Sequence, residues 1–261
     1  MKRINAKTYN LIRVLALLVA AGVLIYASYS LTNSYLGYKK DEAKYAAINN
    51  MFEQDNTAGS SSGGLSYSSG NKKWVWNYKA MLKYNDEAIG YIKLDNSRIQ
   101  YPIVQHSDNK FYLSHGSDKV SNGAGAIFVD TRTASLDNRF AIVYGHNMLD
   151  GSMFADIMDF RKKKFCKTHQ TFDMYVGYKH YLYYVFSTFS TDSDNKKIYA
   201  FGFKDDAEYA NYIDSVYNKS TYHFANGKPT VKDKIVLLST CVDDYGNRQL
   251  VALYRGEEVV D

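Results

Sequence analysis

The sequence predicts a mainly β protein, a small barrel of about eight short strands decorated with helices. After residue 72, short apolar or alternating runs recur between clusters of Gly, Asn, Asp and Ser, which is typical of strands joined by turns. No internal repeat is present, and eight short strands with a few helices fit a closed barrel. The expected strands are Ala88–Leu94, Ile99–Val104, Gly125–Val129, Phe140–Tyr144, Phe172–Val176, Tyr181–Ser187, Ile235–Leu238 and Leu250–Tyr254.

Two stretches of the same region have helical character. The segment 74–88 has a helix-compatible spacing, with Trp76, Met81 and Leu82 available for packing. The segment Asp205–Asn218 begins with Asp–Asp–Ala–Glu, and acidic residues are favoured at the positive end of a helix. We therefore expect one helix before the first strand and another before the last two strands.

An apolar segment near the N-terminus predicts a membrane anchor. Val14–Leu31 has eighteen residues without a charge and would be about 27 Å long as a helix, close to the thickness of a bilayer core. Basic residues precede it, which favours a cytoplasmic N-terminus and an extracellular body. A cleaved signal peptide is the alternative, because Ala and Ser near the end of the run suit a peptidase, although the run is long for one.

Composition then divides the chain into four parts. Residues 1–13 form a basic cytoplasmic terminus, and residues 14–31 form the single-pass anchor. Residues 32–71 form an extracytoplasmic arm and a linker, because ten of the twelve residues of Gly59–Gly70 are Gly or Ser. Residues 72–261 form the folded, catalytic or binding domain.

Charge and motif content exclude several functions. The net charge is +5, and four of these charges precede residue 14, so the rest of the chain carries only +1 and a nucleic-acid partner is not expected. No HExxH, CxxC or paired-His spacing indicates a metal site, and no GxGxxG or Walker motif indicates a nucleotide cofactor. We expect neither metal nor cofactor.

Cys241 and His146 are the candidate reactive pair. Cys241 follows the strand Ile235–Leu238, and His146 directly follows the apolar strand Phe140–Tyr144, where a rigid scaffold presents reactive groups. A cysteine nucleophile needs such a neighbouring base. Two other interpretations of Cys241 remain open at this point, namely a packing residue and a disulfide with Cys166 outside the cell.

Several motifs resemble those of sortases, the membrane-anchored cysteine transpeptidases of Gram-positive bacteria. "LSTC" at 238–241, followed by an Arg at the start of the next strand, resembles their active-site segment. "NDEAIGYIKLDNSRIQYPIVQ", "SDNKFYLSHG", "GAGAIFVDTR" and "YGHNMLDGSMF" resemble class B members in particular and occur in the same order. The resemblance covers about residues 74–254 and implies the sortase-type eight-stranded barrel.

The resemblance also implies roles for individual residues. Cys241 would be the nucleophile, His146 the proton-transfer partner and Arg248 the cation that stabilises the oxyanion. Arg255 is the alternative cation, because the gap between Cys241 and Arg248 is shorter than in many class B members. The expected substrate-binding residues are Leu113, Ser239, Tyr222 and Asp243.

The implied reaction cleaves a C-terminal sorting signal of a secreted protein after Thr and forms a thioester on Cys241. An amine of a peptidoglycan precursor, or a pilin Lys, then receives the protein. Two further functions remain open. A hydrolytic cell-wall Cys peptidase or amidase would use the same residues with water as acceptor, and a non-catalytic tethered binding module would not need the reactive pair.

Overall fold

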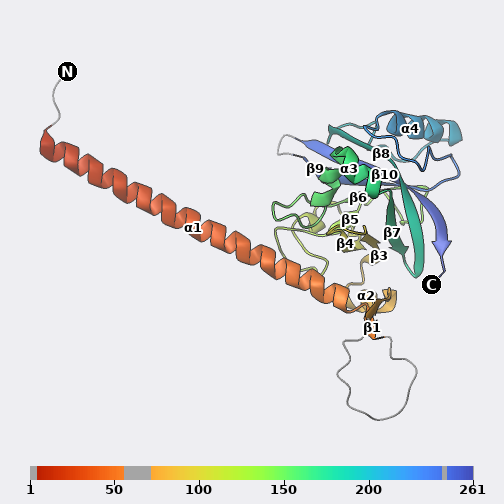
Figure 1. The fold of residues 1–261 in the computed structure, drawn as a ribbon, viewed down its shortest axis with the longest axis horizontal. Coiled ribbons are helices and arrows are strands. Elements are labelled where there is room, and N and C mark those ends of the chain that lie inside the picture. Colours follow the sequence, from red (N-terminus) through yellow and green to blue (C-terminus); the bar gives the residue numbers. More distant parts are fainter. Residues whose placement is uncertain (1–4, 56–71, 243–245, 261) are drawn as a thin grey trace, which may run out of the picture. The chain divides into compact units, whose positions relative to one another are not determined.

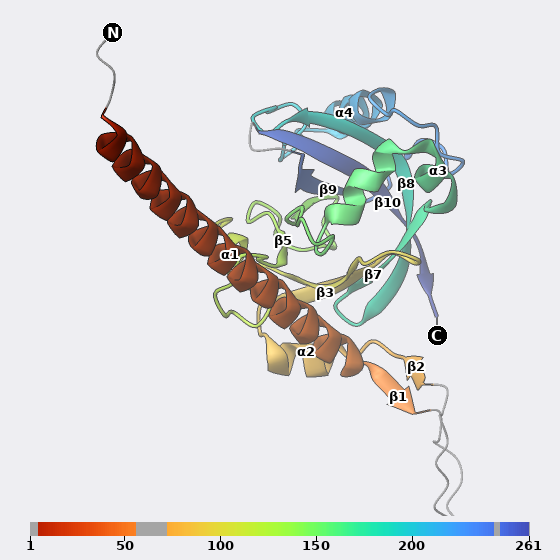
Figure 2. The ribbon, with the colours of Figure 1, turned by 60° about the vertical axis from the view of Figure 1, so that its left-hand side comes forward.

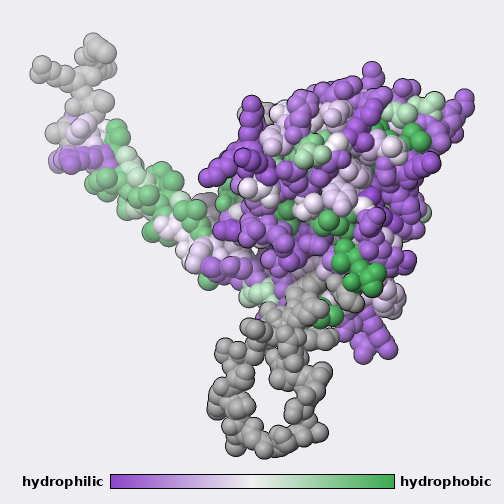
Figure 3. Space-filling view, turned by 45° about the vertical axis from the view of Figure 1, so that its right-hand side comes forward, coloured by the Kyte–Doolittle hydropathy of each residue, from purple (hydrophilic) through white to green (hydrophobic). Residues whose placement is uncertain are grey.

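The computed structural model describes residues 5–55, 72–242 and 246–260. The chain divides into two compact units, residues 1–43 and residues 44–261. Helix α1 (Ala6–Asn50) supplies nearly all of the first unit. The most apolar stretch of α1 has a mean hydropathy of 2.3, and none of that stretch is buried. Among the described residues, α1 is the one helix that is long and apolar enough to cross a membrane. Figure 3 shows this stretch as a hydrophobic band (green) on the helix.

The second unit begins earlier than the sequence indicated. The last turns of α1 belong to it, and their side chains Tyr45 and Ile48 are buried, as is Phe52 just beyond the helix. Tyr45 and Ile48 are three residues apart and therefore share one face of the helix. Part of the region expected to be an extracytoplasmic arm is therefore in the hydrophobic core, and the compact unit starts at Lys44 instead of residue 72.

A small sheet and a short helix follow α1. β1 (Glu53–Asp55) pairs antiparallel with β2 (Lys72–Trp74), and the expected Gly/Ser linker between them lies outside the described residues. α2 (Tyr78–Tyr84) is the expected helix before the first barrel strand, and the Asn77 side chain caps it by accepting a hydrogen bond from the backbone N–H of Ala80.

The expected barrel is confirmed (Figures 1 and 2). Its strands are β3 (Ala88–Lys93), β4 (Gln100–Val104), β5 (Ile127–Val129), β6 (Phe140–Tyr144), β7 (Thr171–Val176), β8 (Lys179–Asp192), β9 (Ile235–Cys241) and β10 (Asn247–Val259). They close in the order β10-β8-β7-β3-β4-β5-β6-β9. The pairs β4–β5 and β6–β9 are parallel and the others antiparallel. The helices that connect these strands are η1 (Phe111–Leu113), η2 (Ala155–Arg161), α3 (Lys163–Thr168) and α4 (Asp206–Asn218).

Strand β9 is buried on both faces, which explains its unbroken apolar start. Val236 and Leu238 point into the barrel core, whereas Ile235 and Leu237 point outward into a second cluster with α4. Figures 1 and 2 show α4 covering this side of the barrel. Side chains alternate along a strand, so Ser239 and Cys241 continue the outward-facing row beyond the part that α4 covers.

Candidate active site

A pocket of about 970 Å³ occupies the outer face of the barrel at the end of β9. Its lining includes five of the residues singled out from the sequence: Leu113, His146, Ser239, Cys241 and Arg248. The register of three neighbouring strands explains why residues so far apart in sequence meet here.

Cys241 and Arg248 lie directly opposite each other on β9 and β10. Residues paired in this way on antiparallel strands point to the same face, with Cβ atoms about 5 Å apart. The next pair closes the hairpin, because the N–H of Val242 donates to the carbonyl of Asn247 over 2.9 Å. Asp243 falls between these residues and lies outside the described part of the chain. The hairpin thus places Cys241 and Arg248 on the same face at the pocket, where the guanidinium donates to the carbonyl of Asn247 at 3.1 Å.

His146 reaches the same end of the sheet from β6. β6 runs parallel to β9 with Tyr144 opposite Ser239, and the N–H of Gly145 donates to the carbonyl of Ser239 over 3.2 Å. Cys241 ends β9 two residues beyond Ser239, whereas His146 lies in the loop two residues beyond the end of β6, and both residues line the pocket. Their placement in one pocket supports the expected partnership, which stays a prediction.

Gly145 is needed at the turn that leads into His146. A Cβ atom at this position would lie 2.7 Å from the Phe154 ring, closer than side chains tolerate. The ring of Phe154 is fully buried. The backbone N–H of Phe154 donates to the carbonyl of His146 over 2.8 Å. The loop therefore folds back onto the histidine and fixes its backbone.

The imidazole of His146 is held by a backbone carbonyl. Its Nε2 lies 2.8 Å from the carbonyl oxygen of Leu113. A carbonyl can only accept, so Nε2 carries the proton and Nδ1 of the neutral ring is left with a lone pair. Gly125 makes this approach possible: its φ is +63°, and a Cβ there would be 2.5 Å from the Tyr112 carbonyl oxygen and 3.0 Å from the His146 ring.

Ser239 is buried beside the nucleophile candidate and has a partner that the sequence did not reveal. Its hydroxyl lies 3.0 Å from the hydroxyl of Tyr199, which also lines the pocket. Tyr199 belongs to the segment between β8 and α4, where no sequence motif marks it. Burial raises the pKa of Tyr199 above its usual value, so its hydroxyl stays protonated and able to donate.

Arg132 is a second pocket residue that sequence reasoning missed. Its guanidinium binds both oxygens of the buried Asp130 carboxylate, at 2.9 and 2.7 Å, and stacks over Phe201 at 4.2 Å. Burial acts to raise the pKa of Asp130, but hydrogen bonds from Arg132 and Tyr144 outweigh it and lower that pKa. The "FVDTR" segment contains both charges, but nothing in it marks Arg132 as a pocket residue.

Other candidates have no part in the pocket lining. Tyr222 packs edge-on against Phe224, with ring centroids 4.9 Å apart. Arg255 donates to the carboxylate of Asp137 at 2.5 Å and to the hydroxyl of Tyr183 at 2.9 Å, so it belongs to a different cluster.

The two cysteines are not bonded to each other. The thiol of Cys166 is buried 3.0 Å from the carbonyl oxygen of Phe160, and burial raises its pKa to about 11. Cys241 is partly exposed in the pocket. Within the described residues, no three His, Cys, Asp or Glu side chains group to hold a metal ion.

Comparisons with known proteins agree on one family. Residues 92–255 match the family described as the sortase domain. Sortase B of Listeria monocytogenes is 36% identical over 162 residues, which are 62% of this chain and 65% of that relative's length. A crystal structure of B. anthracis sortase B superimposes with a TM-score of 0.70 at 28% identity, covering 85% of this chain and 100% of that one. The Staphylococcus aureus sortase B–substrate complex has a TM-score of 0.64 at 30% identity, covering 69% and 84%.

Proposed function

The chain belongs to the sortase family, in class B, and from this premise we propose that it is a cysteine transpeptidase that attaches secreted proteins to the cell wall. The observation that carries the proposal is the register of β6, β9 and β10, which gathers a thiol, an imidazole and a guanidinium at one end of a single pocket.

In the first half of the proposed reaction, Cys241 attacks a peptide. His146 takes the proton of the Cys241 thiol, the thiolate adds to the carbonyl carbon of the Thr in a sorting signal, and the carbonyl oxygen becomes an oxyanion. Arg248 stabilises that charge, and the loss of one such donor typically costs about 3 kcal/mol. The C–N bond then breaks, His146 gives a proton to the departing amine, and the acyl group remains on the sulfur as a thioester.

In the second half, an amine takes the acyl group from the sulfur. The amine nitrogen attacks the thioester carbonyl, His146 accepts a proton from it, and the thiolate of Cys241 leaves. Secreted proteins bearing the signal are the proposed donors, and a peptidoglycan-precursor amine or a pilin Lys is the proposed acceptor. The Staphylococcus aureus relative has been solved in complex with a substrate, which supports a substrate-binding role for this chain.

Ser239 and Leu113 line the pocket and are proposed to contact the sorting signal. Asp243 is proposed to help orient the reacting groups, because it follows the nucleophile closely. Tyr222 packs against Phe224 and does not line the pocket, so we assign it no contact with the sorting signal.

The N-terminal apolar helix supports a proposal about location. We propose that residues 14–31 cross the cell membrane once, with residues 1–13 in the cytoplasm and the body outside the cell. Because peptide and acceptor are both extracellular, the anchor would hold the enzyme where they meet. Membrane fractionation of cells that express the chain, followed by protease treatment from outside, tests the location: the body should be cleaved in intact cells.

Mass spectrometry tests the reaction itself. The full chain in detergent is incubated with a panel of Thr-containing sorting peptides, with and without an amine acceptor. We expect an acyl adduct on wild type and on Cys166→Ala, no adduct on Cys241→Ala, and transfer of the adduct to the amine. An adduct that only hydrolyses when amine is present would favour a peptidase. Adduct formation by Cys241→Ala would refute the assignment of the nucleophile.

A further inference from the structure

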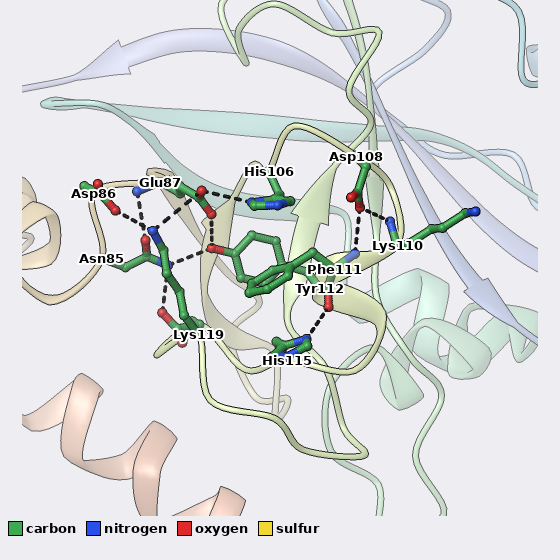
Figure 4. Close-up of polar contacts among 11 residues, drawn as sticks. Asn85, Asp86, Glu87, His106, Asp108, Lys110, Phe111, Tyr112, His115 and Lys119 are labelled. Atoms are coloured by element: carbon green, nitrogen blue, oxygen red, sulfur yellow. Dashed lines mark hydrogen bonds and ion pairs between the residues drawn. The ribbon is translucent and has the colours of Figure 1, made fainter.

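The short helix η1 connects the pocket to a polar cluster behind it. Leu113, its last residue, lines the pocket and supplies the carbonyl that binds His146. Tyr112 precedes it and is fully buried. Figure 4 shows its hydroxyl reaching toward Asn85 and Glu87. One three-residue element therefore carries both the contact to the histidine and the attachment to the cluster.

The buried hydroxyl of Tyr112 both donates and accepts a hydrogen bond. It donates to Oε2 of Glu87 at 2.5 Å and accepts from Nδ2 of Asn85 at 3.0 Å. Asn85 is buried and also donates to the carbonyl of Ser117 at 2.8 Å, while its Oδ1 accepts from the N–H of Glu87 at 2.8 Å. Buried polar groups lose substantial free energy when a partner moves away, so this network sets the position of Tyr112 tightly.

Glu87 is kept ionised by its surroundings. Its second oxygen accepts from Nδ1 of His106 at 2.9 Å and lies 3.6 Å from Nζ of Lys119. Burial acts to raise the pKa of Glu87, but the hydrogen bonds from Tyr112 and His106 outweigh it and lower that pKa. A carboxylate accepts more strongly than a neutral group, which strengthens the bond to Tyr112.

Phe111 fixes the other end of η1. Its ring is stacked between the imidazoles of His106 and His115, with centroid distances of 4.3 and 4.1 Å (Figure 4). Its backbone N–H donates to the carboxylate of Asp108 at 2.8 Å. None of Phe111, Tyr112, Asn85 or Glu87 lines the pocket, so any effect on chemistry is indirect, and the Leu113 carbonyl is the hydrogen-bonded link from η1 to His146.

We propose that Tyr112 and Glu87 are positioning residues, whose hydrogen bond fixes η1 so that the Leu113 carbonyl holds the Nε2 proton of His146. A neutral imidazole has two tautomers, and only the Nε2–H form leaves Nδ1 free as a base. A reacting group displaced by about 1 Å can lose on the order of a hundredfold in rate. The catalytic consequence rests on the proposed function, whereas the effect on the imidazole does not.

The test compares four substitutions in the full chain, in detergent and with ¹⁵N-labelled histidine. Tyr112→Phe removes only the hydroxyl, and Glu87→Ala removes its acceptor. Glu87→Gln keeps an acceptor oxygen. Tyr209→Phe is the matched control, because this buried tyrosine donates to the carbonyls of Arg139 and Asp233, away from the pocket.

Each variant is measured by NMR and by kinetics. At alkaline pH, where imidazoles are neutral, the separation of the Nδ1 and Nε2 chemical shifts of His146 reports how strongly one tautomer is favoured; a His146→Gln chain assigns the signals. The kcat and KM for acylation by an accepted sorting peptide report the chemistry. We expect Tyr112→Phe and Glu87→Ala to reduce the shift separation and to lower kcat about tenfold with KM little changed. Glu87→Gln should stay within about threefold of wild type.

The outcomes separate the two proposals. Unchanged shifts and unchanged kcat in Tyr112→Phe would overturn the positioning role, as would equal losses in Tyr209→Phe, which would indicate a general effect on stability. If the His146 shifts respond to Tyr112→Phe but wild type is acylated by no peptide, the positioning of the imidazole is supported and the proposed function fails.

Discussion

Replacing Gly125 by alanine changes the point at which η1 meets His146. Gly125 has a φ of +63°, a conformation that costs a residue with a Cβ about 1–2 kcal/mol. The added Cβ would be 2.5 Å from the Tyr112 carbonyl oxygen, 3.1 Å from the Leu113 carbonyl oxygen and 3.0 Å from the His146 ring. Ordinary contacts are about 3.5 Å, so η1 or the ring must retreat by roughly 1 Å.

This displacement acts on stability and on chemistry together. Conformational strain and crowding together should lower the free energy of unfolding by about 2–4 kcal/mol. A retreat of about 1 Å breaks the 2.8 Å bond between the Leu113 carbonyl and Nε2 of His146, and we expect acylation of Cys241 to fall about a hundredfold. Urea denaturation measures the first quantity, and mass spectrometry of the acyl adduct measures the second.

Gly123 provides the matched control two residues away. A Cβ added there meets nothing within 4 Å, so Gly123→Ala should fold and acylate nearly as wild type. If Gly125→Ala, folded under the assay conditions, acylates within threefold of Gly123→Ala, the contact between η1 and the imidazole has no catalytic importance. The reasoning from the His146–Leu113 bond would then be refuted.

Three further substitutions or modifications test other parts of the structure. Phe52→Ala removes a fully buried ring whose centroid lies 5.0 Å from that of Trp76, and it should destabilise a chain starting at Lys44 by about 3–5 kcal/mol in urea denaturation. Tyr178→Ala is the control, because Tyr178 is 74% exposed and its loss should cost under about 1 kcal/mol. Equal losses in the two variants would contradict the assignment of Phe52 to the core. Lys234 and Arg255 lower the pKa of Asp137 to about 2, so its ion pairs contribute stability above the ordinary carboxyl pKa of about 4 and lose it as the pH falls toward 2. Because Asp137 is 61% exposed, Asp137→Asn should cost under about 1 kcal/mol at pH 7 and nothing near pH 2, and a loss that persists at pH 2 would show another cause. A thiol reagent should modify Cys241 in the folded chain and reach Cys166 only after unfolding, since Cys166 is buried with a pKa raised to about 11; rapid modification of two thiols in the folded chain would contradict this.

The sequence predicted the strands well where apolar and polar residues alternate along the strand, or where an apolar run is buried on both faces. Phe140–Tyr144 was predicted with the same bounds as β6, because its apolar run is short and ends at a turn signal. β8 and β10 are much longer than expected, at 14 and 13 residues. Their ends carry polar residues that pair with each other, such as Arg248 with Thr191, so hydrogen bonding extends these strands beyond their apolar centres.

Some residues of the candidate site could be predicted from the local sequence, and others could not. Cys241 and His146 could be found because each follows an apolar strand that the sequence marks. Tyr199 and Arg132 could not, because their position at the pocket depends on how the segment after β8 folds back over β5 and β6. The burial of Tyr45 was hidden for a similar reason: its hydroxyl donates to the carbonyl of Gly125, 80 residues away.

The strand register favours Arg248 over Arg255 as the proposed cation. In this hairpin a gap of seven residues pairs Arg248 with Cys241. A longer gap in a relative can form the same pair when the extra residues all lie in the loop. Arg255 is seven positions farther along β10, about 23 Å away, and an odd separation points it to the opposite face. A guanidinium there cannot reach a carbonyl bound at Cys241, so the shorter gap does not weaken the role proposed for Arg248.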